Sequence, residues 1–564
     1  MDLRETARKH ALKNAFEYGS AQPGNVAGKV AAEFPEARKD MKAAMKVIAE
    51  VVGEVNSLGK EEVESELSRY EFAEKREEPK KWELPGAEEG KVVTRFLPEP
   101  NGYPHMGHAK AAWISAEFAR QWGGSVLLRF DDTNPEAEKP EFVDAIREGI
   151  AWLGIVFSRE SFTSDLMPKF YDCAEQLVKQ GDAYVCTCTR ERISAGRRDG
   201  KACACRDKPS AEDALLWKKM ASGGFGEEEA VLRLKGDMAS PNTAMRDPAL
   251  FRVVKTPHFR QGAKYPAWPT YDFEVSIADS LGGITHAMRS KEYELRDELY
   301  YEIVKRLGLR APYVYDFSRL NLKGTVLSKR FIKPLIEEGK VSGWDDPRMP
   351  TLAGVRRRGI LPEAIRRFVL SFGLSKVESE PGWDALLNEN KKLLDPVSEH
   401  YYFVPDPVRV SVRNATRETA MLKKLHSPDS GLRAIPTTET FFIPKADAES
   451  LALGEKVRLK DLYNVEIRSF RNGGIDAEFA GNAQVDAKKI QWVSEPNVEV
   501  SVVEPGDLLS GKEFNPESLK KVAGLAEPET ALLEVGAIVQ FERYGFCRLD
   551  KKTGGGLEFI LSCR

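Results

Sequence analysis

The stretch from Lys91 to Phe130 limits the possible fold more than any other part of this chain. An apolar run, VVTRF, is followed by the turn-rich PEPNGYP, by an apolar helical stretch and by a second strand-like run, SVLLRF. Strand, turn, helix and strand in this order are typical of a parallel crossover. We therefore predict an α/β core that begins near residue 91.

The chain has 564 residues, which is more than one hydrophobic core usually organises, so we expect several domains. Apolar side chains between Met41 and Val55 follow one face of a helix and predict that residues 1–90 form a helical extension and a linker. The rest divides into the first half of the α/β core (91–185), a charge-rich insertion (186–265), the second half of the core (266–330), a helical region (331–395) and a β-rich end (396–564).

Period-two alternation marks the β-rich end. It is seen in VRVSVR (Val408–Arg413), VEVSVV (Val498–Val503) and AIVQFERYGF (Ala537–Phe546). Short alternating strands between turn residues are typical of β-barrels and sandwiches. We predict a pair of β-barrels over residues 396–564.

The bulk charge does not identify a partner. The net charge is −3, from 84 Lys plus Arg against 87 Asp plus Glu, yet a local basic stripe can still bind nucleic acid. No stretch approaches the roughly 18 apolar residues that a membrane helix needs, and the start MDLRETARKH is too polar for a secretory signal. With 42% hydrophobic and 30% charged residues, the sequence predicts a soluble, cytoplasmic protein without a membrane partner.

The strongest motif is RFLPEPNGYPHMGHAKAAW, from Arg95 to Trp113. His105 and His108 fall where the predicted helix begins, and the unpaired N–H groups of a helix N-terminus attract phosphates. Gly107 lets a base or a phosphate approach the backbone, and imidazoles can donate hydrogen bonds to phosphate oxygens. These residue types predict an ATP site, although an isolated His-x-Gly-His is also compatible with histidines that merely cap a helix.

This segment strongly resembles the His-Ile-Gly-His signature of class I aminoacyl-tRNA synthetases, in the longer form of the glutamyl and glutaminyl branch. FSRLNLKGTVLSKR, from Phe317 to Arg330, is similar to the second signature of that family, Lys-Met-Ser-Lys-Ser, with Val326 and Leu327 in place of its first lysine and its methionine. We call the two the first and second signature segments. The resemblance implies a Rossmann-type core in which His105, His108 and Lys329 are catalytic and in which ATP is contacted by Pro98, His105, Gly107, His108, Leu320, Ser328 and Lys329.

Two further segments resemble the amino-acid pocket of the same family. LLRFDDTNP (Leu127–Pro135) implies that Asp131 lies near the substrate α-ammonium, since a buried cation needs a carboxylate partner. The segment from Tyr265 to Glu298 implies pocket roles for Tyr271 and for Arg289, with Arg95 facing them. Glutaminyl enzymes have a small uncharged residue at the position of Arg289, so this arginine favours glutamate. The alternative is a surface ion pair of Arg289 with Glu292 or Glu294.

Four of the seven cysteines lie close together in CTCTRERISAGRRDGKACACR. Four thiolates can close a tetrahedral zinc site, and four free thiols are the alternative interpretation. The candidate zinc ligands are Cys186, Cys188, Cys203 and Cys205. Glutamyl enzymes of this type carry such a knuckle in the insertion that approaches the acceptor end of the tRNA. We expect Cys173, Cys547 and Cys563 to be ordinary buried or terminal cysteines.

The resemblance spans about residues 91–564 and is closest to archaeal-type glutamyl-tRNA synthetases, because the β-rich end is similar to their anticodon-binding barrels and residues 331–395 to their stem-contact region. It implies an ATP- and Mg²⁺-dependent ligase that joins L-glutamate to tRNA(Glu), with tRNA(Gln) as a second candidate substrate. We expect a monomer, with the N-terminal extension as a candidate site for another protein. The alternatives are a glutamine–tRNA ligase and, from a different class, a non-catalytic tRNA-binding homologue.

Overall fold

The computed structural model describes all residues except 1, 68, 71–80, 326–328, 426–430 and 472. It separates into two compact units, Met1–Lys81 and Trp82–Arg564. No helix in the described residues is both long enough and apolar enough to cross a membrane.

The smaller unit is a bundle of helices. The predicted amphipathic helix is confirmed as α3 (Met41–Asn56), which buries Ala44, Ile48, Val51, Val52 and Val55. Of these, Ile48, Val51, Val52 and Val55 pack with Ala7, Ala11 and Leu12 of α1 (Leu3–Tyr18) in a core of their own. The other two α-helices of the bundle are α2 (Pro23–Glu33) and α4 (Lys60–Leu67).

A parallel sheet lies at the centre of the larger unit. Strands β1 (Val93–Phe96), β2 (Ser125–Phe130) and β3 (Arg159–Phe162) pair in this order, with α5 (Met106–Gln121) and α6 (Pro140–Leu153) as the crossover helices. This confirms the parallel crossover. A second parallel pair, β8 (His286–Ser290) and β9 (Tyr313–Phe317), adjoins β1, because the N–H of Thr285 donates to the carbonyl of Val93 at 2.8 Å.

The segment between β3 and β8, which includes the predicted insertion (186–265), contains an antiparallel sheet of four strands. Its strands are β4 (Ala183–Cys186), β5 (Val231–Leu234), β6 (Ala249–Val253) and β7 (Ala267–Pro269). The helices that accompany it are α7 (Met167–Gln180), α8 (Arg190–Asp199) and α9 (Ser210–Ala221). The chain then enters α10 (Tyr271–Leu281), and α11 (Asp297–Arg306) lies between β8 and β9.

Among the described residues, four α-helices lie between β9 and the β-rich end. They are α12 (Lys329–Glu337), α13 (Leu352–Arg358), α14 (Pro362–Leu370) and α15 (Trp383–Leu394). Helix α14 packs on α5, and its Ile365 and Phe368 share a hydrophobic core with Met106 and Ala109. The helical region is thereby fixed against the helix that begins at the first signature segment.

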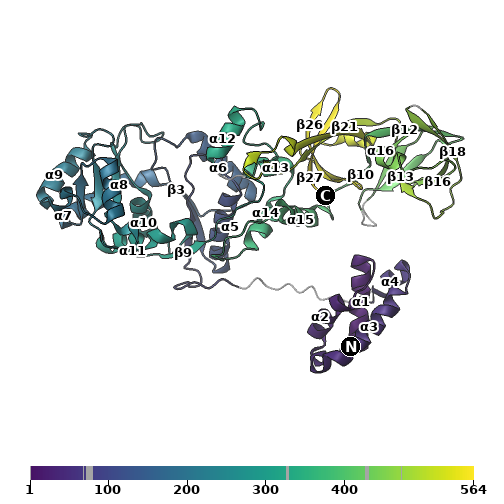
Figure 1. The fold of residues 1–564 in the computed structure, drawn as a ribbon, viewed down its shortest axis with the longest axis horizontal. Coiled ribbons are helices and arrows are strands. Elements are labelled where there is room, and N and C mark those ends of the chain that lie inside the picture. Colours follow the sequence, from purple (N-terminus) through teal and green to yellow (C-terminus); the bar gives the residue numbers. More distant parts are fainter. Residues whose placement is uncertain (1, 68, 71–80, 326–328, 426–430, 472) are drawn as a thin grey trace. The chain divides into compact units, whose positions relative to one another are not determined.

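The β-rich end forms two barrel-like sheets of seven strands each (Figure 1). The first has the order β19-β16-β17-β18-β12-β15-β20, with β12 (Pro407–Arg413), β15 (Thr440–Pro444), β16 (Lys456–Leu459), β17 (Asn464–Arg471), β18 (Gly474–Phe479), β19 (Lys489–Ile490) and β20 (Val493–Ser494). The second has the order β10-β25-β26-β27-β21-β24-β11, with β10 (His400–Tyr401), β11 (Phe403–Pro405), β21 (Val498–Pro505), β24 (Leu519–Ala526), β25 (Ile538–Phe541), β26 (Gly545–Thr553) and β27 (Gly556–Cys563).

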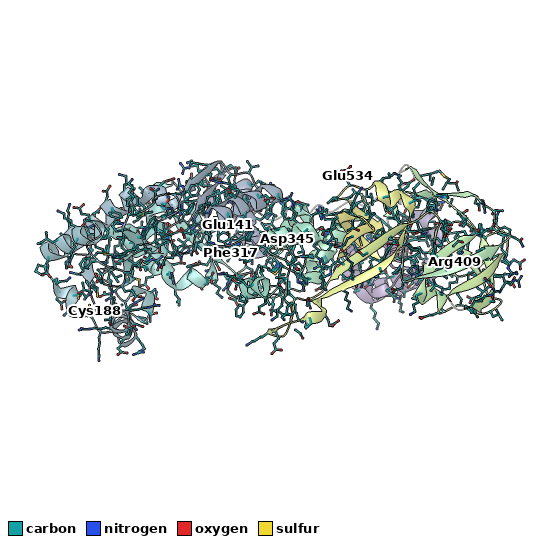
Figure 2. The ribbon with its side chains drawn as sticks, turned by 90° about the horizontal axis from the view of Figure 1, so that it is seen from above. Glu141, Cys188, Phe317, Asp345, Arg409 and Glu534 are labelled. Carbon is teal, nitrogen blue, oxygen red and sulfur yellow. The ribbon has the colours of Figure 1, made fainter. Side chains whose placement is uncertain are left out.

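The alternating run Ala537–Phe546 contributes to two strands, because β25 ends at Phe541 and β26 begins at Gly545. Arg543 turns the chain between them with a φ of 61°, a left-handed conformation that alternation of apolar residues does not reveal. Within the larger unit, Cys188 of the insertion lies at the end opposite Arg409 of β12 (Figure 2).

Candidate active site

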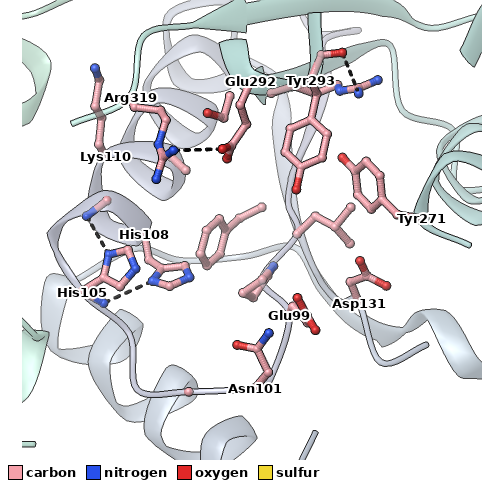
Figure 3. A pocket seen from close by; sticks show the side chains of 18 of the residues that line it. Glu99, Asn101, His105, His108, Lys110, Asp131, Tyr271, Glu292, Tyr293 and Arg319 are labelled. Atoms are coloured by element: carbon pink, nitrogen blue, oxygen red, sulfur yellow. Dashed lines mark hydrogen bonds and ion pairs between the residues drawn. The ribbon is translucent and has the colours of Figure 1, made fainter. Parts of the chain in front are cut away.

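A cavity of about 710 Å³ opens at the carboxyl ends of β1, β2 and β8, where ligands commonly bind in open parallel sheets. Its lining brings together nine residues that the sequence predicted for a site, namely Arg95, Pro98, His105, Gly107, His108, Asp131, Tyr271, Arg289 and Leu320. Ser328 lies outside the described residues, and the side chain of Lys329, the first residue of α12, is not described. Figure 3 shows the two histidines on one side of the cavity and Asp131 and Tyr271 on the other.

His105 and His108 cap the first turn of α5. The Nδ1 atom of His105 accepts from the N–H of Gly107 at 3.1 Å, and the Nδ1 atom of His108 accepts from the N–H of His105 at 3.2 Å. The expected helix start at His105 is confirmed. Two backbone N–H groups that the helix leaves unpaired are thus satisfied by the two imidazoles.

Both imidazoles are neutral at physiological pH. Burial lowers the pKa of His108 to about 4 and lowers that of His105 well below its ordinary value, with the neighbouring His108 as a further cause. A neutral imidazole whose Nδ1 accepts a hydrogen bond must carry its proton on Nε2. Each ring therefore has one N–H donor left for a ligand such as a phosphate oxygen.

Lys110, one turn further along α5, also lines the cavity and was missed by the sequence analysis. Its Nζ donates to the carbonyl and to the hydroxyl of Ser318, at 2.6 and 3.0 Å, and its side chain is 1% exposed. Burial lowers the pKa of this lysine to about 8. Lys110 thus ties the first signature segment to the second. A lysine on the apolar face of the helix, at HAKAAW, was the signal that could have revealed it.

Arg95 is held by a buried charge network. Its Nε donates to Asp279 at 3.0 Å and its Nη1 to the carbonyl of Met288 at 2.6 Å. Arg129 donates to the same carboxylate oxygen of Asp279 at 2.6 Å. Two guanidiniums therefore share one carboxylate, and Nη2 of Arg95 has no hydrogen-bond partner in the described part of the chain.

Arg289 is buried, with 4% of its surface exposed. The surface ion pair considered above does not form, because Glu292 pairs with Arg319 and Glu294 pairs with Lys376. Arg289 instead stands 3.4 Å from Asp297, between Nη1 and Oδ1, and its Nη2 donates to the carbonyl of Tyr293 at 3.5 Å. Within the described residues, its Nε and Nη1 have no hydrogen-bond acceptor. Such donors call for an anionic ligand.

The opposite side of the cavity is acidic. Asp131 follows β2 and accepts a hydrogen bond from the hydroxyl of Thr133 at 3.0 Å. Burial, together with the charge of Glu99, raises the pKa of Asp131 to about 7. Glu99 comes from the first signature segment and was also missed by the sequence analysis. A cation bound between these carboxyl groups would restore the ionised form of Asp131.

Asp132 and Asn134, which follow Asp131 in the same loop, have structural roles. Asp132 accepts from the N–H and the hydroxyl of Ser164 at 2.8 and 2.6 Å, and the N–H of Asn134 donates to Glu138 at 2.7 Å. These bonds fix the loop that presents Asp131.

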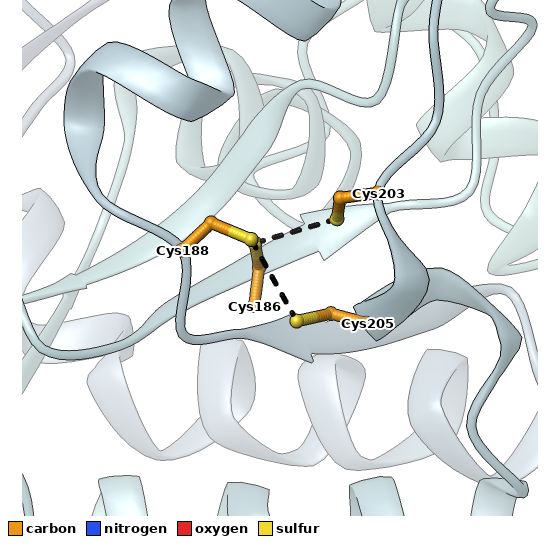
Figure 4. Close-up of side chains that lie close together, drawn as sticks. All are labelled: Cys186, Cys188, Cys203 and Cys205. Carbon is orange, nitrogen blue, oxygen red and sulfur yellow. Dashed lines mark hydrogen bonds between the residues drawn. The ribbon is translucent and has the colours of Figure 1, made fainter.

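Cys186, Cys188, Cys203 and Cys205 converge in the insertion (Figure 4). All four sulfur atoms lie within 4.8 Å of one another, with Cys186 and Cys203 at 3.7 Å and Cys188 and Cys205 at 3.9 Å. A tetrahedron with Zn–S distances of about 2.3 Å has S–S edges of about 3.8 Å. The donor set and spacing therefore fit zinc, and Arg233, with Nη1 3.8 Å from two of the sulfurs, would offset part of the thiolate charge.

The remaining cysteines are as expected. Cys547 and Cys563 are buried in the second barrel-like sheet, and Cys173 packs against the core of the insertion. None of the three is part of the four-cysteine cluster.

Comparison with models of known protein families shows to which family the chain belongs. Residues 91–396, more than half of the chain, match the model described as "tRNA synthetases class I (E and Q), catalytic domain". The chain belongs to this synthetase family. Two further models of the E and Q synthetases, both described as anti-codon binding domains, match residues 398–483 and 489–550, which correspond to the two barrel-like sheets. Catalysis by a synthetase implies ATP and a divalent metal ion.

Similar synthetases from archaea match this chain over its length. The glutamate–tRNA ligase of Nitrosopumilus maritimus is 43% identical over 98% of this chain and 98% of its own. That of Korarchaeum cryptofilum is 40% identical over 100% of this chain and 99% of its own, and that of Thermococcus kodakarensis is 40% identical over 97% of both.

Proposed function

We propose that this synthetase is an archaeal-type glutamate–tRNA ligase. The observation that carries the choice of amino acid is Arg289, buried at the cavity wall with two nitrogen atoms that lack acceptors. The similarity to archaeal glutamate–tRNA ligases over nearly the whole chain supports the same assignment. The expected substrates are L-glutamate, ATP and tRNA(Glu), with tRNA(Gln) as a second candidate acceptor.

The reaction has two steps. An oxygen of the glutamate α-carboxylate attacks the α-phosphorus of ATP, the bond to the β-phosphate bridging oxygen breaks, and pyrophosphate leaves. A hydroxyl of the terminal tRNA ribose then attacks the carbonyl of the adenylate, and AMP leaves. Neither step needs a covalent enzyme intermediate, so the work of the protein is to position the reactants and to stabilise charge.

His105 and His108 would serve the first step as neutral donors. Their Nε2–H groups can bind phosphate oxygens as charge develops there, and the N-terminus of α5 adds its own partial positive charge. Gly107 lets the nucleotide approach the backbone, while Pro98 and Leu320 provide apolar contacts at the same wall. We propose that Lys329, with Ser328 beside it, stabilises the pyrophosphate leaving group. Mg²⁺ would shield the phosphate charge when bound.

The amino-acid end follows the charges of the cavity. Asp131, assisted by Glu99, would bind the α-ammonium group. Tyr271, Arg95 and Arg289 would surround the side chain, with Nη2 of Arg95 and Nε of Arg289 as donors to the γ-carboxylate, while Nη1 of Arg289 faces Asp297. Glutamine would place N–H donors against these donors, and a site built in this way rejects it.

We also propose that the four cysteines hold one structural zinc ion and that the insertion receives the acceptor end of the tRNA. Zinc with four thiolate ligands has no open position for catalysis, so its contribution would be to the local fold. The domain boundaries predicted above, the monomeric state and the cytoplasmic location remain proposals. A glutamine–tRNA ligase is the runner-up, and Arg289 is the residue that disfavours it.

Aminoacylation separates these functions. Purified protein is given purified tRNA(Glu) and tRNA(Gln), each with glutamate or with glutamine. The proposal expects glutamate to be joined to tRNA(Glu), and the result for tRNA(Gln) defines how strictly the tRNA is selected. Preferential charging with glutamine would replace the proposal by its runner-up, and the absence of any ATP-dependent charging would favour a non-catalytic homologue.

A further inference from the structure

Behind Arg289 lie two aspartates that the reaction described above does not use. Asp316 on β9 is the direct register partner of Arg289 on β8. Asp297 is the first residue of α11, and its Oδ1 atom is 3.4 Å from Nη1 of Arg289. One guanidinium is therefore backed by two carboxyl groups from two different elements.

Each of the two carboxyl groups has one oxygen atom without a donor in the described part of the chain. Asp316 is 2% exposed, and the side chain of Asp297 is 24% exposed. The Oδ1 atoms of Asp297 and Asp316 are both inaccessible to solvent, and neither accepts a hydrogen bond from any N–H or O–H group in the described residues. Two buried acceptors without a donor are costly, and a proton held between the two carboxyl groups would supply the missing hydrogen bond.

The surroundings favour this single proton. Burial and a side-chain hydrogen bond with Asp316 raise the pKa of Asp297 to about 7, while the charge of Arg289 opposes the shift. Two adjacent carboxylates share a proton because both cannot ionise cheaply at short range. Other charged or titratable groups near the pair are Tyr301 of α11, Tyr315 of β9 and Lys376 after α14. Arg289 itself is surrounded by Arg95 of β1, Tyr271 of α10, Tyr293 and Tyr300.

The charge count at this end of the cavity shows what the proton achieves. Arg95 and Arg129 share Asp279, which leaves one positive charge. The charge of Arg289 is cancelled when Asp297 and Asp316 together carry one negative charge. The sum is then one positive charge, which complements one γ-carboxylate. Loss of the shared proton would add a negative charge and bring the sum to zero. The site would then distinguish a carboxylate from a neutral amide less strongly.

We propose that Asp297 and Asp316 are positioning residues that hold Arg289 and share one proton, so that this end of the cavity stays selective for an anionic side chain. The proposal rests on the proposed function, because it takes Arg289 to read the γ-carboxylate. It assigns the selectivity to the two residues behind the arginine as well as to the arginine itself.

The test is the ratio of kcat/KM for glutamate to kcat/KM for glutamine, measured with tRNA(Glu) from pH 6.0 to 8.5. For the wild type we expect the ratio to fall by about tenfold across this range. A tenfold change corresponds to a difference of about one pKa unit in the aspartate pair between the glutamate-bound and glutamine-bound protein. In Asp316→Asn, the amide N–H replaces the shared proton at all pH values, so the ratio should not depend on pH. Asp316→Ala supplies no donor and should lower the ratio throughout.

Two controls make the outcome decisive. Asp144→Asn changes an exposed aspartate on α6, remote from the cavity, and should retain the pH profile of the wild type. Thermal unfolding shows whether each variant is folded. If Asp316→Asn is not folded, Asp297→Asn replaces it, and its ratio should likewise not depend on pH. A wild type that prefers glutamate with a ratio independent of pH, and equal to that of Asp316→Asn, overturns this inference alone. A wild type that prefers glutamine at every pH overturns the proposed function instead.

Discussion

The Nδ1 atom of His108 accepts a hydrogen bond from the backbone N–H of His105, at 3.2 Å. This bond assigns the imidazole proton to Nε2 and leaves His108 without a basic nitrogen that faces the ligand. Burial holds the pKa of the ring at about 4. His108 is therefore suited to donate a hydrogen bond to a phosphate and unsuited to act as a general base near pH 7.

Stability should fall as the pH falls below 6.5, in part because of His108. Its pKa is lowered in the folded state, so between pH 6.5 and 4 the unfolded chain binds a proton that the folded chain does not. The loss attributable to this residue is on the order of 3 kcal/mol by pH 4. Urea unfolding at pH 7.0 and 4.5 should show a smaller difference for His108→Asn than for the wild type. Equal differences in the two proteins would contradict the burial argument.

Asp131 should have the opposite effect, because its pKa is raised. The folded state keeps the proton that the unfolded chain loses between pH 4 and 7, so stability is lost as the pH rises through this window. At pH 8, Asp131→Asn should therefore stabilise the ligand-free protein, by an amount on the order of 3 kcal/mol, while it abolishes activation of glutamate.

Thermal unfolding and pyrophosphate exchange measure these two effects of Asp131→Asn. The matched control is Asp144→Asn, which alters an exposed carboxylate and should change neither quantity. A destabilised Asp131→Asn protein would show that Asp131 is ionised and paired without substrate, contrary to its surroundings in the structure.

Lys329→Ala should lower kcat about a hundredfold and leave the affinity for tRNA nearly unchanged. The lysine is proposed to act on charge that develops on pyrophosphate, and loss of one such contact costs roughly 3 kcal/mol of barrier. Lys333→Ala is the control: this lysine is in the same helix, is 64% exposed and pairs with Glu337. Unchanged turnover of Lys329→Ala, or an equal loss in Lys333→Ala, would remove the second signature segment from the reaction.

The cysteine cluster should contain close to one equivalent of zinc in protein purified without chelators. Double replacement of Cys186 and Cys203 by Ser should release it, whereas Cys173→Ser, outside the cluster, should not. The catalytic core should remain folded without zinc, because the hydrophobic core of this region, which also includes Phe273 of α10 and Leu299 of α11, does not contain the four cysteines. Metal analysis that finds no zinc in the wild type would refute the site.

Sequence patterns predicted the parallel crossover because one helix and two strands are each continuous in the chain. The first signature segment likewise placed His105 at a helix start, since local capping chemistry depends on neighbours in sequence. Asp279 was not predicted. It joins Arg95 and Arg129 across about 150 to 184 residues, and a third carboxylate on a helix that already contains Asp272 and Glu274 does not reveal its partners in the sequence. The pairing of Arg289 with Asp297 in place of Glu292 or Glu294 has the same cause.

In the proposed function the choice of amino acid depends on Arg289. Nε and Nη1 of Arg95 are already bound to Asp279 and Met288. Arg289 would therefore supply most of the donors for a γ-carboxylate. The control for its substitution is Arg296→Cys, which removes a cation that also lines the cavity, is 45% exposed and pairs with Asp272. This variant should keep the preference for glutamate.

Glutamate and glutamine are nearly equal in shape, so charge and hydrogen bonding must separate them. Arg289→Cys removes the buried cation, and the γ-carboxylate then meets Asp297 and Asp316 without the guanidinium between them. Glutamate activity should fall by factors on the order of 10² or more, while slight glutamine activity appears, because the amide no longer faces unpaired donors. Aminoacylation of tRNA(Glu) with each amino acid measures both changes. If Arg289→Cys charged glutamate as well as the wild type does, the side chain would be read elsewhere, and the selectivity assigned to Arg289 would be wrong.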